Sequence, residues 1–199
     1  MNKKIVSVIL ILIICLSTLS GCYDAESIET LAYAVAIGID KGENDRIKLS
    51  LQIALPNSSP GQEGSSQSEE SSINSVDCSS IDAGIALINT YISEKINLSH
   101  CKAIVISEEI AYEGISEYLY TLVSNLELRP DCNVIVSKCK ASDYLHNSDQ
   151  SLEKLSARYY EFTFNSSEYT GYTQNITLSD FYSTILSTTS HAYAILRRN

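Results

Sequence analysis

Cys22 is the residue whose surroundings most clearly indicate a chemical modification. It directly follows Leu19, Ser20 and Gly21, so small residues lead into a cysteine. This order fits the bacterial lipobox, in which the cysteine thiol takes a diacylglycerol group before the leader is cleaved. We therefore predict lipid attachment at Cys22, with the three residues before it as the processing signal.

The segment before Cys22 has the layout of a signal peptide. Lys3 and Lys4 give it a positive start, and Ile5–Leu16 is nearly all apolar. That run is shorter than the about 20 apolar residues that a membrane-spanning helix needs. We expect residues 1–21 to be a lipoprotein signal peptide. An uncleaved anchor, or an ordinary secretory leader followed by a chance cysteine, is the alternative.

Lipidation would make Cys22 the N-terminus and would hold the chain to a membrane. The expected group is a diacylglycerol on sulfur together with an N-acyl lipid. Each buried CH₂ contributes about 0.8 kcal/mol, so two or three long acyl chains attach a protein durably. We expect the chain to be tethered to the outer face of a cytoplasmic membrane.

Residue patterns typical of catalysis are missing from the sequence. It contains no glycine-rich phosphate loop, no G-x-S-x-G and no H-E-x-x-H. His100, His146 and His191 lie far apart, and we interpret His100 as a turn residue. Glu108 and Glu109 are consecutive, so on a helix they diverge by about 100°; we interpret them as charges at a helix N-terminus. We expect no enzymatic activity and no bound cofactor.

The remaining cysteines leave the redox state open. Cys15 leaves with the leader and Cys22 carries lipid, so four remain: Cys78, Cys101, Cys132 and Cys139. An even number outside the cytoplasm permits disulfides, but none of the four has C-x-x-C spacing, so we expect no metal site. Because three of them lie in or beside apolar strand-like runs, we favour buried free thiols.

The charge of the mature chain excludes some partners. Lys3 and Lys4 are lost with the leader, which takes the 14 basic residues of the full chain to 12, against 24 acidic ones. Such an acidic protein is not expected to bind nucleic acid or to dock electrostatically on anionic lipid. The length that remains suits one domain of ordinary size plus a little more.

The residues after Cys22 indicate a helix and then a β-hairpin. Residues 23–32 begin with acidic side chains and continue with apolar ones at helical spacing, which predicts a short helix. Ala34–Ile39 is an apolar run, a turn cluster follows at 40–45, and Ile47–Ile53 alternates strictly. This pattern predicts a hairpin whose second strand has one buried face.

Residues 56–76 interrupt this pattern with a polar segment. It is rich in Ser, Gly, Gln and Glu and nearly devoid of large apolar side chains. Such a composition does not contribute to a core, so we predict a disordered surface loop.

The second half of the chain alternates helix-like and strand-like segments. Apolar residues at helical spacing predict a helix over 79–96. Strand-like runs at 101–107 and 132–137 suit central parallel strands joined by a helix over 108–126. Further helices are expected at 142–145, 151–161 and 178–187. The order predicts a mixed α/β (α+β) fold with a mixed β-sheet of about four to six strands covered by helices.

A series of motifs runs through the chain after the lipobox. Gly21–Asp24 reads G-C-Y-D, Ile28–Leu31 reads I-E-T-L, and Gly38–Gly42 reads G-I-D-K-G. The series continues through Gln52, the serine-rich insertion, His100-x-Lys102, Arg129, Lys140-Ala141 and Leu145. Together these residues resemble the Ger(x)C family of spore germination lipoproteins, the C subunits of nutrient germinant receptors. Members of that family usually have Trp where this chain has Tyr23.

The resemblance implies a non-enzymatic subunit on the outer face of the spore inner membrane. It would be required for receptor assembly or coupling in spore germination. The implied partners are a membrane-embedded subunit and a larger A-type subunit, together with the bilayer through the lipid on Cys22. A ligand-binding lipoprotein of a transport or sensing system is the alternative, and a secreted hydrolase comes third.

The same resemblance implies a domain organisation, because family members are longer and have further domains after the first. Residues 1–21 would be the signal peptide. We expect residues 22–147 to form an N-terminal germination-protein domain, with the predicted loop inside it. Residues 148–199 would be a helical linker and the start of a following domain that is missing from this chain.

Overall fold

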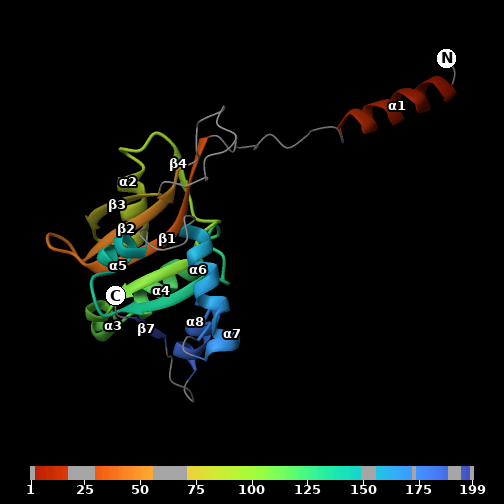
Figure 1. Ribbon diagram of the computed structural model, residues 1–199. Coiled ribbons are helices and arrows are strands. Elements are labelled where there is room, and N and C mark those ends of the chain that lie inside the picture. Colours follow the sequence, from red (N-terminus) through yellow and green to blue (C-terminus); the bar gives the residue numbers. More distant parts are fainter. Residues whose placement is uncertain are drawn as a thin grey trace, which may run out of the picture. The chain divides into compact units, whose positions relative to one another are not determined.

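The computed structural model describes residues 3–17, 30–55, 71–148, 156–171, 174–187 and 194–197 of the 199 residues. The chain divides into two compact units, Met1–Thr30 and Leu31–Asn199. In the first unit, helix α1 (Lys3–Ser17) covers the predicted apolar leader (Figure 1). Among the described residues, no helix is both long and apolar enough to cross a membrane.

The second unit is built on a mixed β-sheet. Its main strands follow the order β3-β2-β1-β5-β6-β7, and the short β4 pairs with the beginning of β1. Neighbours β3, β2 and β1 are antiparallel, whereas β1, β5, β6 and β7 run parallel. The strands are β1 (Leu31–Lys41), β2 (Ile47–Ala54), β3 (Ser71–Cys78), β4 (Lys95–Asn97), β5 (Ala103–Ser107), β6 (Asn133–Ser137) and β7 (Ile195–Arg197).

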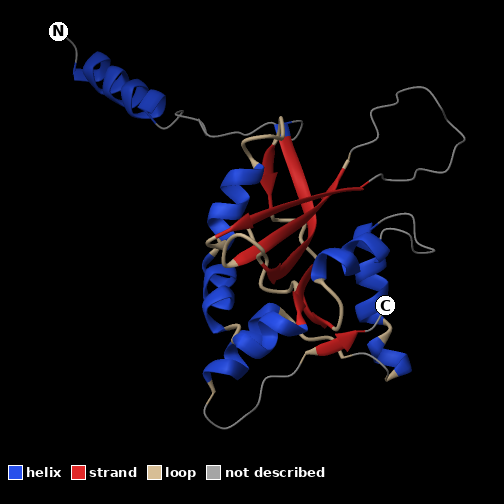
Figure 2. Cartoon of the chain, turned by 90° about the vertical axis from the view of Figure 1, so that its left-hand side faces the viewer, coloured by secondary structure: helices blue, strands red, loops and turns tan. Residues whose placement is uncertain are grey.

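Helices cover both faces of this sheet, as Figures 1 and 2 show from two directions. One face packs against α2 (Ile81–Ile88), α3 (Glu108–Glu113), α4 (Ser116–Ser124) and α8 (Leu178–Leu186). The other packs against α5 (Ala141–Ser148) and α6 (Ser156–Asn165), and α7 (Ser167–Thr170) follows α6. A strand between two helical layers must be apolar on both sides, and every residue of β5 is buried. The predicted fold class is therefore confirmed.

The two strand pairs predicted from sequence are present. Strands β1 and β2 form the antiparallel hairpin, with Ile39 opposite Leu49. Strands β5 and β6 are parallel neighbours, with Ile104 opposite Val134. The crossover between them holds two helices rather than one, because Gly114 at φ 120° separates α3 from α4.

Two helix predictions were wrong at their ends because short strand pairs replace them. Leu31 and Ala32 begin β1, where they pair with Lys95 and Ile96 of β4. The predicted helix over 79–96 ends at Ile88, turns follow over 89–94, and Lys95 and Ile96 belong to β4. Residues 23–29 of the other predicted helix lie outside the described residues.

The polar segment predicted as a loop over 56–76 contains a strand at its end. Residues 71–76 belong to β3, which pairs with β2 along its whole length. Ser75 lies opposite Ser50, and their hydroxyl oxygens are 2.8 Å apart. Cross-strand hydroxyl bonds of this kind let polar residues form an edge strand. Residues 56–70 lie outside the described residues.

The range 148–199, predicted as a linker and the start of a following domain, contributes α6, α8 and β7 to the second unit. Tyr160 and Phe164 of α6 are buried against the sheet, and Leu178 and Phe181 of α8 are buried on its other face. The described residues of this range therefore complete the core. The predicted boundary at residue 147 of a longer protein stays a prediction.

Candidate functional site

The predicted lipid-attachment site, Cys22 with Leu19, Ser20 and Gly21, lies outside the described residues, so lipidation stays a prediction. Strand β1 begins at Leu31, nine residues after Cys22. Nine residues of extended chain span at most about 30 Å. An anchor on Cys22 would therefore stay within that distance of the start of β1.

A cavity opens at the edge where the parallel strands begin. Strands β5 and β6 run in the same direction, so the turns that lead into them meet at one edge of the sheet, which we call the entrance edge. The cavity there has a volume of about 540 Å³. Side chains from the turns before β5 and β6, and from α6, line it. This entrance cavity has a size typical of small-molecule sites.

The charged side chains around the entrance cavity pair with one another. Lys102 Nζ lies 2.7 Å from Glu161 Oε1 of α6. In the turn before β6, an Arg129 guanidinium nitrogen lies 2.6 Å from Asp131 Oδ2. These groups are partly exposed, so their pairing contributes little stability. They leave the cavity with both signs of charge on its wall.

Asn133 gives the entrance cavity an unusual feature. Among the described residues, its Oδ1 is the one buried side-chain polar atom without a hydrogen-bond partner. Buried acceptors in proteins are nearly always satisfied, so each exception calls for an explanation. No group of three or more metal-binding side chains occurs in the described part of the chain.

The structure supports the interpretation of the histidines and of the paired glutamates. His100 lies in the turn before β5, with its ring 4.6 Å from that of Tyr33 in an edge-to-face contact. His146 is exposed in the last turn of α5, and His191 lies outside the described residues. Glu108 and Glu109 occupy the first turn of α3, which confirms them as charges at a helix N-terminus.

Lys41 links the end of β1 to helix α3. Its ammonium lies 3.3 Å from Glu109 Oε1 and forms a shorter contact with Glu113. The hydrogen bond that Lys41 donates to Glu113, followed by the one to Glu109, raises the pKa of Lys41. The carboxylates of Glu109 and Glu113 therefore form an exposed ion-pair cluster with Lys41.

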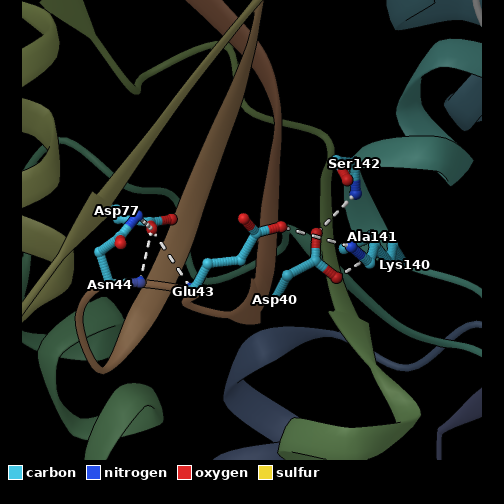
Figure 3. A network of polar contacts seen from close by, with 7 residues as sticks. All are labelled: Asp40, Glu43, Asn44, Asp77, Lys140, Ala141 and Ser142. Atoms are coloured by element: carbon cyan, nitrogen blue, oxygen red, sulfur yellow. Dashed lines mark hydrogen bonds and ion pairs between the residues drawn. The ribbon is translucent and has the colours of Figure 1, made fainter.

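Asp40, in the G-I-D-K-G motif, caps a helix that begins a hundred residues later. Its side chain is buried, and its two carboxylate oxygens accept hydrogen bonds from the backbone N–H groups of Ala141 and Ser142, at 2.6 and 2.9 Å (Figure 3). A carboxylate at a helix N-terminus satisfies free N–H groups and interacts favourably with the helix dipole. Asp40 therefore fixes α5 to the end of β1, which the spacing of residues in the sequence did not reveal.

The glycines of the same motif are required by close packing. A Cβ on Gly42 would lie 2.3 Å from the backbone carbonyl oxygen of Asp45. A Cβ on Gly38 would lie 3.0 Å from Leu145 Cδ1 of α5. The glycines of this motif therefore have a structural role.

Asp77 closes the hairpin turn beside this motif. Its Oδ2 accepts hydrogen bonds from the backbone N–H of Asn44, at 2.9 Å, and of Glu43, at 3.2 Å (Figure 3). The backbone N–H of Asn44 is the main cause that lowers the pKa of Asp77. Glu43 also lies 3.9 Å from Lys140, immediately before α5. The turn between β1 and β2 is thus tied both to β3 and to α5.

A buried chain of hydrogen bonds joins α6 to β2. The hydroxyl of Tyr160 donates to Gln52 Oε1 at 2.9 Å and lies 3.0 Å from the hydroxyl of Ser148. Gln52 Nε2 in turn donates to the hydroxyl of Ser71 at 3.1 Å. Burial raises the pKa of Tyr160, so its hydroxyl stays protonated and remains a donor. These polar groups satisfy one another and leave no reactive group free.

The four cysteines of the second unit carry free thiols in the structure. Cys78, Cys101 and Cys132 are buried, and Cys139 is half-buried. Burial raises the pKa of Cys78 and of Cys132, which suppresses their thiolate forms. Cys101 Sγ and Cys132 Sγ lie 3.5 Å apart at the entrance edge.

Residues 24–196 match the model of a protein family described as "Spore germination protein N-terminal domain". Three curated relatives come from Bacillus subtilis. Putative spore germination protein YfkR is 31% identical over 161 residues, which are 79% of this chain and 41% of that protein. Spore germination protein A3 is 43% identical over 58 residues, which are 29% of this chain and 16% of that protein.

Spore germination protein KC is 29% identical over 130 residues, which are 63% of this chain and 32% of that protein. The chain therefore spans less than half the length of the curated relatives it matches. No solved structure matches it.

Proposed function

The chain belongs to the spore germination protein N-terminal domain family, and we propose on that basis that it acts in spore germination as a lipid-anchored, non-enzymatic subunit of a nutrient germinant receptor. The observation that carries the proposal is where the family match begins. It starts at residue 24, two residues after the lipobox cysteine. The relatives named as spore germination proteins support the role in germination.

Lipidation of Cys22 would place the domain on the outer face of the cytoplasmic membrane, which is the inner membrane of the spore. The eight residues between Cys22 and β1 would keep the start of β1 within about 30 Å of the bilayer. At that distance the domain could contact a membrane-embedded subunit directly. The two or three acyl chains expected on Cys22 are sufficient to retain it there.

The ionisable groups of the domain support a structural rather than a catalytic role. Asp40 caps α5, Lys41 pairs with glutamates of α3, and Arg46 forms two hydrogen bonds with Glu117 of α4. Each of these groups links one element to another. We therefore propose that the subunit serves receptor assembly or coupling.

An exposed apolar surface on α2 and α4 supports contact with another subunit. The two helices contact each other on one face of the sheet. Large apolar side chains on or just after them are exposed to solvent: Leu87, Tyr91, Tyr120, Val123 and Leu126. Exposed apolar side chains of this size can take part in a protein–protein interface. The proposed occupants are the membrane-embedded and A-type receptor subunits.

Substitution of Cys22 tests this proposal. In spores that carry Cys22→Ser, we expect the protein to be lost from the membrane fraction and dipicolinate release in a rich nutrient mixture to be delayed or abolished. Cys15→Ser, a cysteine change inside the leader helix, is the matched control and should alter neither result. A normal nutrient response from Cys22→Ser spores that lack the protein in their membranes would contradict the proposal.

The entrance cavity favours a second function, that of a ligand-binding lipoprotein. Its volume of about 540 Å³ and its charges of both signs suit a small zwitterion or polyol. A ligand present at 100 times its dissociation constant would stabilise the fold by about 2.7 kcal/mol. Thermal unfolding against amino acids and sugars detects this, and Asn133→Leu should remove the effect. No stabilisation by any of them would eliminate this second function.

A further inference from the structure

Cys101 and Cys132 lie just before two neighbouring strands. Cys101 ends a turn in which its N–H donates to the carbonyl of Leu98 at 3.0 Å, two residues before β5. Cys132 ends a turn in which its N–H donates to the carbonyl of Arg129 at 3.2 Å, one residue before β6. Because β5 and β6 are parallel neighbours, these two turns lie side by side at the entrance edge.

The two thiols face each other within the core. Their sulfur atoms lie 3.5 Å apart, and the side chains are 2% and 1% exposed. A disulfide bond is about 2.05 Å long, so the sulfurs need to approach by about 1.5 Å. The backbones beside them are already held together, because Asn133 N–H donates to the carbonyl of Lys102 at 2.9 Å.

We propose that Cys101 and Cys132 form a disulfide when the chain is exposed to an oxidising thiol–disulfide couple. Four cysteines allow three complete pairings, and the structure selects this one pair. Cys78 ends β3, where it pairs with Ile47 at the start of β2. Cys139 lies after β6, with its sulfur 3.1 Å from the Ser137 hydroxyl. The cysteine spacing in the sequence did not single out any pair.

The reaction is a thiol–disulfide exchange with a small disulfide such as oxidised glutathione. One protein thiolate attacks a sulfur of the small disulfide and forms a mixed disulfide, which releases one small thiol. The second protein thiolate then attacks the mixed disulfide and releases the other small thiol. The protein loses two electrons and two protons, and one small disulfide is reduced to two thiols.

The biological setting of this disulfide rests on the proposed function. Disulfides persist outside the cytoplasm, where the lipid anchor would place the domain, and are rare inside it. The bond would join the turns before β5 and β6 and would close a loop that contains α3 and α4. Closing a loop of about 30 residues is expected to raise the thermal unfolding midpoint by on the order of 10 °C.

Redox refolding tests the pair directly. The reduced chain without its leader is refolded from denaturant in a glutathione buffer at pH 8.5. The cysteines can then form disulfides before the thiols are buried. Free thiols are then alkylated, and the protein is digested and mapped by mass spectrometry. We expect one dominant linked peptide, Cys101 to Cys132, lighter than the two free peptides by two hydrogen atoms, together with the higher unfolding midpoint.

Variants at the four cysteines provide the control. Cys78→Ser and Cys139→Ser should keep the linked peptide and the rise in midpoint. Cys101→Ser and Cys132→Ser should lose both. Fully free thiols after refolding, or a dominant link through Cys78 or Cys139, would overturn the proposal.

Alkylation of free thiols in intact cells traps the redox state that Cys101 and Cys132 have there. This measurement tests the disulfide separately from the proposed location of the domain. A linked peptide recovered after trapping supports both the pair and its location outside the cytoplasm. A pair that links during redox refolding but is recovered reduced from cells would confirm its chemistry and contradict the proposed location.

Discussion

Asp40→Asn tests whether the G-I-D-K-G motif acts by capping α5. In the native structure, both carboxylate oxygens of Asp40 accept from backbone N–H groups, those of Ala141 and Ser142. Asparagine has the same shape but only one side-chain acceptor. Its NH₂ group would face one of the two N–H groups, so a donor would meet a donor where an acceptor stood.

The expected loss follows from these two bonds. Hydrogen bonds to a charged group contribute about 1.5–3 kcal/mol each, and a buried N–H without a partner costs about 1–3 kcal/mol. Asp40 is 2% exposed, so water does not replace the missing acceptor. We expect Asp40→Asn to lower the free energy of unfolding by about 2–4 kcal/mol.

Urea unfolding followed by circular dichroism measures this loss. With a slope of about 2 kcal/mol/M, the midpoint should fall by about 1–2 M. Asp143→Asn is the matched control, because it removes the same charge from the exposed first turn of the same helix. It should cost only about 0.3–1 kcal/mol. Equal losses for the two variants, or no loss for Asp40→Asn, would refute the capping role.

Three further changes test the packing and the electrostatics. Gly84→Ala would bring a Cβ to 2.6 Å from Leu49 Cδ2, so urea unfolding should show a loss of about 1–3 kcal/mol, whereas exposed Ala86→Ser should change little. Tyr160→Phe removes the donor to Gln52 Oε1 and should cost about 1–3 kcal/mol, in contrast to exposed Tyr169→Phe. The pKa of Asp77 is lower in the folded than in the unfolded chain. The contribution of Asp77 to the free energy of unfolding is therefore fully present above the unfolded pKa of about 3.9, and it is lost as the pH falls through the lower pKa of the folded state. The acid-unfolding profile of Asp77→Asn should be flatter in that window, and an unchanged profile would argue against the turn bonds.

Local patterns were sufficient to predict the central strands. Strict alternation at 47–53 marked β2, and the continuous apolar runs marked β5 and β6 as strands buried on both sides. These signals are local, because each depends on which residues follow one another within a few positions. The order of the elements then gave the mixed sheet with its helical layers.

Pairings with distant strands account for the errors. Leu31 and Ala32 have helical spacing, but β4 offers them partners more than sixty residues later. Ser71 and Ser72 have the composition of a loop, yet β2 pairs with them as an edge strand. No short window of sequence contains such partners.

The same limit applies to the candidate sites. The lipobox is a contiguous motif, so the sequence alone predicts Cys22 as the lipid-attachment residue. The capping role of Asp40 and the Cys101–Cys132 pair depend on residues 101 and 31 positions apart. The entrance cavity is assembled from the turns before β5 and β6 and from α6, and its unsatisfied Asn133 has no sequence signal of its own.

Mass spectrometry of the N-terminal tryptic peptide tests the central claim most directly. The protein is taken from the membrane fraction of cells that express the full chain. A lipid-anchored protein would yield the peptide Cys22–Lys41, with the added mass of a diacylglycerol and an N-acyl group and with no peptide from residues 1–21. An unmodified Cys22, or peptides that continue from the leader across it, would contradict lipid anchoring.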